Sequence, residues 1–206
     1  MVDARPTAEG APPALYAALF APGTKWSVTH VRTSSSTKMA DVPQGQRAKT
    51  VLTCEVRAVV QRPWGLVSRV ECPGLGDELV GPDPLGGHWV ATRVGLFYFA
   101  TDPGAAQPAF TESALVLAAD PKPGHHEHVD PDSRFGPVWS KDVVQTKGTW
   151  CAEQTFASGD RTQRGTCFEA GRGLVRAHSA ATVGLTAYID TFTLVLAKRA
   201  QPLGSP

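Results

Sequence analysis

The residues best suited to chemistry lie in one short histidine-rich segment. Residues 125–132 read HHEHVDPD. In an extended backbone alternate side chains point to the same side, so His126, His128 and Asp130 would converge. Two imidazoles and one carboxylate can bind zinc and leave a coordination position for water. The segment is therefore a candidate metal site, and a metal-bound water there would allow hydrolysis.

The same segment has a simpler interpretation. Its His-x-His-x-Asp string resembles half of the ligand motif of the metallo-β-lactamases, but that motif continues with another histidine, where this chain has Pro131. The layered helices of that fold also have no counterpart in the sequence. We favour a solvated, proline-bounded loop over residues 120–137 that binds metal only adventitiously, and we keep zinc as the alternative.

Other kinds of chemistry find little support. The sequence has no G-x-S-x-G elbow, and Ser113, Ser140 and Ser179 lie in strand-like segments without a recognisable catalytic partner. No glycine-rich loop opens a helix, as a phosphate site would need. The formal net charge is +1 and no basic stripe is present, so we expect no nucleic-acid partner.

Aromatic residues recur at strand spacing and could line either a core or a pocket for an apolar ligand. Aromatic side chains supply large apolar contact areas in both settings, and the sequence does not separate the two. The candidate ligand-binding residues are Trp26, Trp89, Phe97, Phe99, Trp150, Phe156, Tyr188 and Phe192.

The clearest element that could position these residues is a hairpin over residues 50–72. Apolar and polar residues alternate on both sides of a Pro-Trp-Gly turn, which is typical of two half-buried strands. We expect Val60 opposite Leu66, a register that places Cys54 opposite Cys72.

A second hairpin repeats this arrangement. Centring it on Gly159 places Cys151 opposite Cys167 and Trp150 opposite Phe168. Directly opposed cysteines can come within disulfide distance. We therefore predict both disulfides, which imply an oxidising compartment. Four reduced thiols in a cytosolic protein are the alternative.

The N-terminus carries no apolar segment typical of a secretory signal, and no apolar run reaches the ~18 residues of a membrane span. Taken alone, these observations favour the cytosol. Because the cysteine geometry favours an oxidising compartment, we expect an exported protein whose signal has been removed.

The fold class follows from many short strands and few helical segments. The chain has 206 residues, with 20 glycines and 17 prolines. We predict an all-β fold with one short N-terminal helix over 13–20 and about ten strands, including one strand over 89–100. Hairpin connections make the sheet antiparallel. The expected architecture is a strongly curved antiparallel sheet or open barrel. We expect a tether at 1–13, one domain at 14–199 and a tail at 200–206.

Two phrases resemble a broad group of bacterial exported lipoproteins with curled β-sheet domains. The first is LFAPGTKW at residues 19–26, and the second is CFEAGRGLVR at residues 167–176. The resemblance implies an exported, usually lipid-anchored β domain in the periplasm or at the outer membrane. The attachment cysteine of such proteins has no counterpart near Met1.

These observations favour a non-catalytic exported protein that binds an apolar small molecule or lipid, or an envelope protein. Contact with a membrane would then occur only through an N-terminal lipid anchor. The first alternative is a metal-dependent hydrolase or metal-binding protein that uses the histidine segment. The second is a purely structural envelope subunit.

Overall fold

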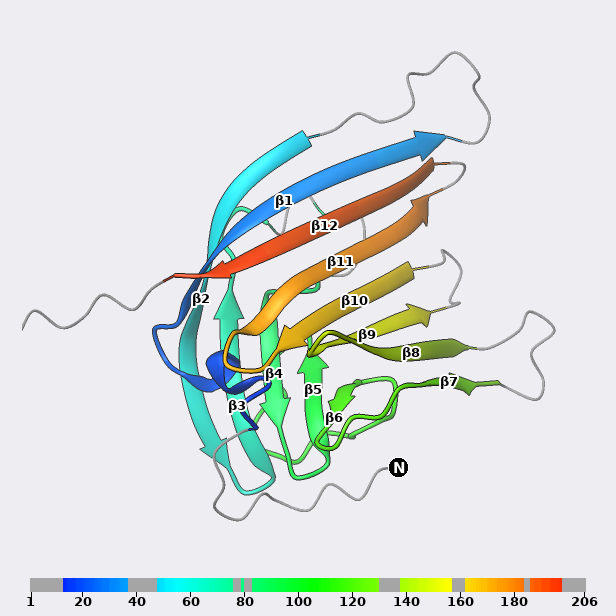
Figure 1. The fold of residues 1–206 in the computed structure, drawn as a ribbon. Coiled ribbons are helices and arrows are strands. Elements are labelled where there is room, and N and C mark those ends of the chain that lie inside the picture. The colour runs from blue at the N-terminus through cyan, green and yellow to red at the C-terminus, as the bar shows by residue number, and fades with distance from the viewer. Residues whose placement is uncertain are drawn as a thin grey trace, which may run out of the picture.

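Twelve antiparallel strands form one sheet in the order β6-β5-β4-β3-β2-β1-β12-β11-β10-β9-β8-β7 (Figure 1). This architecture comes from a computed structural model that describes residues 13–36, 48–75, 79, 83–129, 138–156, 162–183 and 186–197. The elements are η1 (Ala17–Phe20), β1 (Lys25–Ser36), β2 (Ala48–Arg62), β3 (Gly65–Glu71), β4 (Gly87–Ala91), β5 (Gly95–Phe99), β6 (Leu115–Ala118), β7 (Gly124–His128), β8 (Trp139–Thr146), β9 (Thr149–Phe156), β10 (Thr162–Glu169), β11 (Gly173–Val183) and β12 (Thr186–Leu196).

The sheet is strongly curved and open, which confirms the predicted all-β class. Figure 1 shows β1 and β12 to β8 running together as one arm, while β3, β4 and β5 run in another direction and the long β2 bends between them. Among the described strands, β6 and β7 are the two edges. Residues 119–123 connect β6 to β7, and such a short link requires the two edges of the curved sheet to lie close together.

The predicted single strand over 89–100 is wrong, because the chain turns inside it. The Thr92 amide donates to the Gly95 carbonyl oxygen at 2.9 Å, and the Thr92 hydroxyl accepts from the Val94 amide at 3.1 Å. The segment therefore forms β4 and β5, which pair with each other. Its apolar residues fall on both parities because β5 is buried on both faces, and this concealed the turn.

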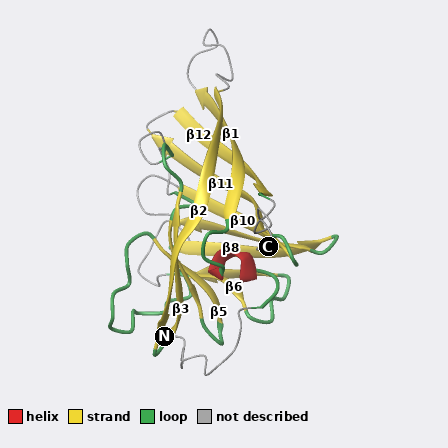
Figure 2. Ribbon diagram, turned by 90° about the vertical axis from the view of Figure 1, so that its left-hand side faces the viewer, coloured by secondary structure: helices red, strands yellow, loops and turns green. Residues whose placement is uncertain are grey.

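The predicted N-terminal helix is a single 3-10 turn, η1. It contacts β2, β3 and β11, and Figure 2 shows β1 and β12 above it and β3 and β5 below it. The Ser68 hydroxyl donates to the Leu19 carbonyl oxygen, which fixes η1 against β3. Gly173 allows the close approach to β11, because a Cβ at this position would lie 2.8 Å from the Cβ of Ala18.

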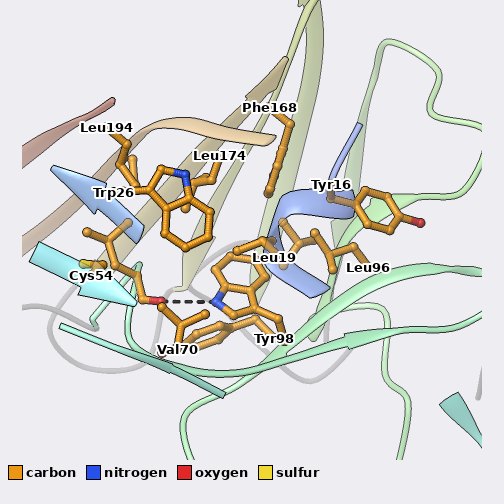
Figure 3. Packing of buried hydrophobic residues seen from close by; sticks show 14 of the residues in the cluster. Tyr16, Leu19, Trp26, Cys54, Val70, Leu96, Tyr98, Phe168, Leu174 and Leu194 are labelled. Carbon is orange, nitrogen blue, oxygen red and sulfur yellow. Dashed lines mark hydrogen bonds between the residues drawn. The ribbon is translucent and has the colours of Figure 1, made fainter. Parts of the chain in front are cut away.

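The main core lies on one face of the sheet, which we call the inner face. Trp26, Leu19 and Phe168 converge in it from β1, η1 and β10 (Figure 3). Trp89 is also fully buried, and its indole N–H donates to the Leu85 carbonyl oxygen at 3.1 Å. Burial of these large apolar side chains, each worth about 1.5–3 kcal/mol, stabilises the curved form of the sheet.

The first predicted disulfide, Cys54–Cys72, is present. The predicted register at its turn is wrong by one residue, because Val60 pairs with Val67 and not with Leu66. A β-bulge next to Val56 absorbs the extra residue, so the register beyond it brings the two cysteines together.

The second hairpin has the predicted register throughout. Cys151 pairs with Cys167, Trp150 pairs with Phe168, and the two cysteines form a disulfide. Both predicted cysteine pairs are therefore confirmed, the second with its predicted register and the first with a bulge that offsets the error at the turn. In the described part of the chain, every cysteine is in a disulfide.

A smaller apolar cluster lies on the opposite, outer face of β3, β4 and β5. The segment between β5 and β6 contributes Phe110, whose ring packs edge-on against Phe97 with centroids 4.8 Å apart. Trp64 and Val90 complete its buried centre, together with Val67. This cluster explains why β5 has no solvent-facing side.

No helix in the described segments is long and apolar enough to cross a membrane. The predicted tether, apart from residue 13, and the whole predicted tail lie outside the described residues.

Candidate functional site

The two edges of the sheet enclose a groove, which we call the seam groove. It lies between β6 with the link at 119–123 on one side and β7 with β8 on the other, and its volume is about 470 Å³. Leu115 and Leu117 come from β6, and Trp139 and Val143 come from β8. This size falls within the ~300–1,000 Å³ of ordinary small-molecule sites. The groove can therefore accept a small ligand with an apolar part.

Strand parity places an ammonium group among the apolar side chains of β8. Trp139, Lys141 and Val143 share one face of this strand, as alternate residues do. All three line the groove. Lys141 retains only 6 % of its accessible surface, although it carries a charged group. A buried lysine is uncommon unless it is paired, so its surroundings need explanation.

Lys141 helps to join the two edges of the sheet. Its Nζ donates to the Leu115 carbonyl oxygen on β6 at 3.2 Å. The side-chain amide of Gln154 donates to the same oxygen at 3.2 Å and to the Ser113 carbonyl oxygen at 3.0 Å. Side chains from β8 and β9 thus bridge to β6 where no backbone ladder is formed between described strands.

A row of polar residues crosses the inner face beside the groove. Register pairs link Lys141 to Gln154, Gln154 to Arg164, Arg164 to Ser179 and Ser179 to Asp190. All five are buried. Because buried polar groups are costly unless they are paired, the contacts along this row determine which of them are available to a ligand.

Arg164 is held by a hydrogen bond and by an aromatic ring. Its Nη2 donates to Gln154 Oε1 at 2.8 Å, and its Cζ lies 4.2 Å from the centroid of the Tyr98 ring. Burial lowers the pKa of Arg164 to about 10, so the guanidinium stays charged at neutral pH. Burial raises the pKa of Tyr98 to about 12, and its hydroxyl donates to the main chain at Asp83 or Gly86, 2.8 and 2.6 Å away.

At the end of the row that is distant from the groove, the charge of Asp190 is neutralised by other residues of the protein. Asp190 accepts from Arg32 Nε at 2.8 Å and lies 2.7 Å from His30 Nε2. The His30 ring also stacks on Phe192, with centroids 4.8 Å apart. These contacts give His30 and Asp190 a structural role in the core.

At the end of the row beside the groove, the charges of Lys141 and Arg164 are not neutralised in this way. Within the described part of the chain, neither Lys141 nor Arg164 forms an ion pair with a carboxylate. Burial lowers the pKa of Lys141, and the nearby Glu112 only partly opposes this shift. The groove floor therefore carries a buried cation whose described contact is a neutral carbonyl oxygen.

The rim of the groove carries both signs of charge. Glu112 and Asp120 contribute carboxylates, Lys122 contributes an ammonium group and His126 an imidazole. Asp120 and Lys122, both exposed, lie on the connecting link. The mixed rim gives no strong net charge, so the buried Lys141 is the distinctive polar feature of the groove.

Residues 125–128 of the histidine segment lie in a strand and not in the loop that we favoured. They belong to β7, which pairs with β8 and is exposed at all five positions. His126 and His128 share one face, as predicted, and His128 stacks on Trp139 with centroids 6.2 Å apart. The third predicted metal ligand, Asp130, lies outside the described residues.

The remaining polar residues of β7 pair with each other and with β8. His125 Nδ1 lies 2.7 Å from Asp142 Oδ1, and its Nε2 lies 3.5 Å from Glu127 Oε2. The hydrogen bond with Asp142 raises the pKa of His125, and the weaker one with Glu127 adds to this effect. Across the described residues, no group of three or more His, Cys, Asp or Glu side chains could hold a metal ion. Zinc binding therefore stays a prediction.

The eight candidate aromatic residues do not form one site. Trp26, Trp89 and Phe192 belong to the main core, where each is at most 1 % exposed. Phe97 and Phe99 belong instead to the outer cluster around Phe110.

The other three are only half-buried. Trp150 packs on the edge of the main core, while Phe156 and Tyr188 lie near the ends of β9 and β12. None of the eight lines the seam groove.

Apart from His126, which was a candidate metal ligand, the groove residues were missed by sequence reasoning. Trp139 and Val143 mark the inner parity of β8, and Lys141 falls between them. A lysine on the apolar face of a strand was the available signal. This signal points to a site only once the contact between Lys141 and β6 is known, and β6 is distant from β8 in the sheet order but close to it in space.

A larger hollow, of about 720 Å³, lies on the outer face across β8 to β12. The Cys151–Cys167 disulfide lies in its floor, and His178 reaches across the strand at Gly165 to Glu153, 3.6 Å away. Its lining mixes threonines and charged side chains with apolar ones such as Val144, Val175 and Ile189. None of the side chains that line this hollow is a buried charged group, which distinguishes it from the seam groove with Lys141.

Comparison with known proteins gives little guidance. No protein-family model and no curated protein matches the sequence. Among solved structures, one described as a "putative lipoprotein" from Parabacteroides distasonis aligns over 91 % of this chain and 100 % of that chain. The sequence identity is 10 % and the TM-score is 0.30, so no argument rests on this similarity.

Proposed function

We propose that this protein is an exported binding protein that holds a small amphipathic molecule in the seam groove. The observation that carries the proposal is the combination of apolar walls with one buried ammonium group in a space of about 470 Å³. Ligand sites of this size are commonly apolar with a few polar groups that fix orientation.

Export is supported by the two disulfides, Cys54–Cys72 and Cys151–Cys167. Disulfides persist in oxidising compartments and are rare in the cytosol. The periplasm or the outer membrane is the compartment that fits the resemblance of the LFAPGTKW and CFEAGRGLVR phrases to bacterial lipoproteins.

Binding, and not catalysis, fits the contacts of the groove best. Lys141 is held by the main chain of β6, and the walls beside it are apolar. A protein partner in the envelope is the competing proposal, since an extended peptide could also lie along an open sheet edge.

Binding of Nile red, an uncharged apolar fluorophore, tests the proposal. Ala118 lines the groove and is only partly buried, so Ala118→Trp fills the space with an indole. The control is Val195→Trp, which adds the same side chain at an outer-face position that is 57 % exposed. We expect wild type and the control to bind the fluorophore and Ala118→Trp to bind at least about tenfold more weakly. Equal binding by all three proteins would contradict the proposal.

A further inference from the structure

The ammonium group of Lys141 has unused donors that face the groove. A protonated lysine carries three N–H donors. One of them is used by the Leu115 carbonyl oxygen at 3.2 Å, and no other described residue accepts from this group. Only 6 % of the Lys141 surface is exposed, so water can bond to the remaining N–H donors less readily than it could at the protein surface.

A second buried cation, Arg164, lies two strands from Lys141 in the same polar row. Gln154 connects the two, since its amide N–H donates to the same Leu115 oxygen and its Oε1 accepts from Arg164 at 2.8 Å. Arg164 contacts the face of the Tyr98 ring and forms no ion pair within the described residues. Asp83 acts on Arg164 only at longer range. Of these three groups only Lys141 lines the groove, so an anion there would accept from its ammonium group.

The rim limits how much negative charge the ligand can carry. Glu112 and Asp120 oppose Lys122 and His126 around the opening, so a polyanion would meet repulsion as well as attraction. One negative charge at Lys141 meets less of this repulsion than a polyanion does, with Glu112 as the carboxylate that acts on Lys141. A single carboxylate also suits two N–H donors, because it can accept both.

We propose that the seam groove takes an amphipathic monocarboxylate, such as a long-chain fatty acid, whose carboxylate accepts from Lys141 and whose chain lies along Leu117, Trp139 and Val143. This inference rests on the proposed function and adds the chemical class of the ligand to it.

Two probes of equal chain length separate the head group from the chain. Laurate carries the carboxylate, and lauryl alcohol carries a neutral hydroxyl instead. Lys141→Met keeps an unbranched apolar stem but removes the charge. We expect this change to weaken laurate binding by at least about tenfold, measured by isothermal titration calorimetry, and to leave the alcohol unchanged.

The matched control removes an exposed lysine outside the groove. Lys49→Met deletes an ammonium group on β2 and should change laurate affinity by less than about threefold, as expected for an exposed charge. Circular dichroism and thermal unfolding of each variant show whether it is folded.

The outcomes distinguish this inference from the function on which it rests. Equal laurate affinity in wild type and Lys141→Met, or tighter binding of lauryl phosphate than of laurate, overturns the monocarboxylate assignment. Wild-type protein that binds neither laurate nor lauryl alcohol overturns the proposed function itself.

A measurement on wild type keeps the inference testable if Lys141→Met does not fold. Burial lowers the pKa of Lys141, and deprotonation removes the positive charge. Laurate affinity should therefore fall as pH rises through that pKa, while the affinity for lauryl alcohol should stay constant. A pH-independent laurate affinity, or the same decline for both probes, overturns the role of Lys141.

Discussion

Removal of the Cys54–Cys72 disulfide is expected to destabilise the protein strongly. The two cysteines are separated by 18 residues, and closing a loop of this length in the unfolded chain corresponds to about 3 kcal/mol at room temperature. Cys54 is also 1 % exposed within the main core, so Cys54→Ala removes buried sulfur contacts. We therefore expect the Cys54→Ala/Cys72→Ala variant to lose at least about 3 kcal/mol in free energy of unfolding.

Urea unfolding followed by intrinsic tryptophan fluorescence measures this loss. The comparison variant is Cys151→Ala/Cys167→Ala, whose separation of 16 residues corresponds to nearly the same chain entropy, about 3 kcal/mol. Each pair has one buried cysteine, and because Cys54 is 1 % exposed while Cys167 is 6 % exposed, the first variant should be slightly the less stable of the two. A loss below about 1 kcal/mol in both would refute the reasoning. Four free thiols in unfolded, unreduced wild-type protein would refute the disulfides and the argument for export.

Three further changes test the buried polar row and the packing of β5. Lys141→Met should raise the free energy of unfolding by about 1–2 kcal/mol at neutral pH in ligand-free protein, since it removes a buried charge without an ion pair. The pKa of Lys141 is lower in the folded protein than the value of about 10.5 expected for the unfolded chain. In the pH window between the two pKa values, the unfolded chain therefore binds more protons than the folded protein. Wild-type stability should therefore rise relative to the variant with increasing pH through that window, and a constant difference would contradict the assignment. Asp190→Ala should cost about 3–5 kcal/mol, because it leaves His30 buried without its carboxylate partner, and a loss below 1 kcal/mol in urea unfolding would show that the pair is dispensable. Gly95→Ala should lower stability by about 1–3 kcal/mol in the same assay, since its Cβ would lie 2.3 Å from the Leu117 carbonyl oxygen, and an unchanged midpoint would argue against this packing.

Strand parity predicted the parts of this fold that depend on local sequence. In the second hairpin, alternation and the Ser-Gly-Asp turn were enough to place Cys151 opposite Cys167. In the first, the cysteine pairing was right although Val60 was placed one residue out of register. A bulge changes register without changing the composition of the strand, so alternation alone could not reveal it.

Burial on both faces hid two other features. The Thr92–Gly95 turn joins two apolar runs, and in the second run both parities are apolar because β5 packs against the main core on one face and against Phe110 on the other. For the same reason Phe97 could not be assigned to a face from its type. The histidine segment was misjudged in the opposite way, since β7 is an exposed edge strand with no apolar alternation to mark it.

The candidate site depended on contacts that no local pattern contains. The seam groove arises where β6 and β8 meet, and these strands are far apart in the order of the sheet. Lys141 could be assigned to the inner parity of its strand from the sequence. Its hydrogen bond to the Leu115 carbonyl oxygen could not be predicted, because this contact depends on the curvature of the whole sheet.

The most direct test of the account is where a fatty acid binds. Titration of isotope-labelled protein with laurate, followed by nuclear magnetic resonance, reports the affected residues one by one. We predict saturable shift changes at the methyl groups of Leu117 and Val143 and at the indole N–H of Trp139, which line the seam groove. Shift changes confined to the outer face around Ile189, or no saturable change at all, would contradict the central claim that this groove is the binding site.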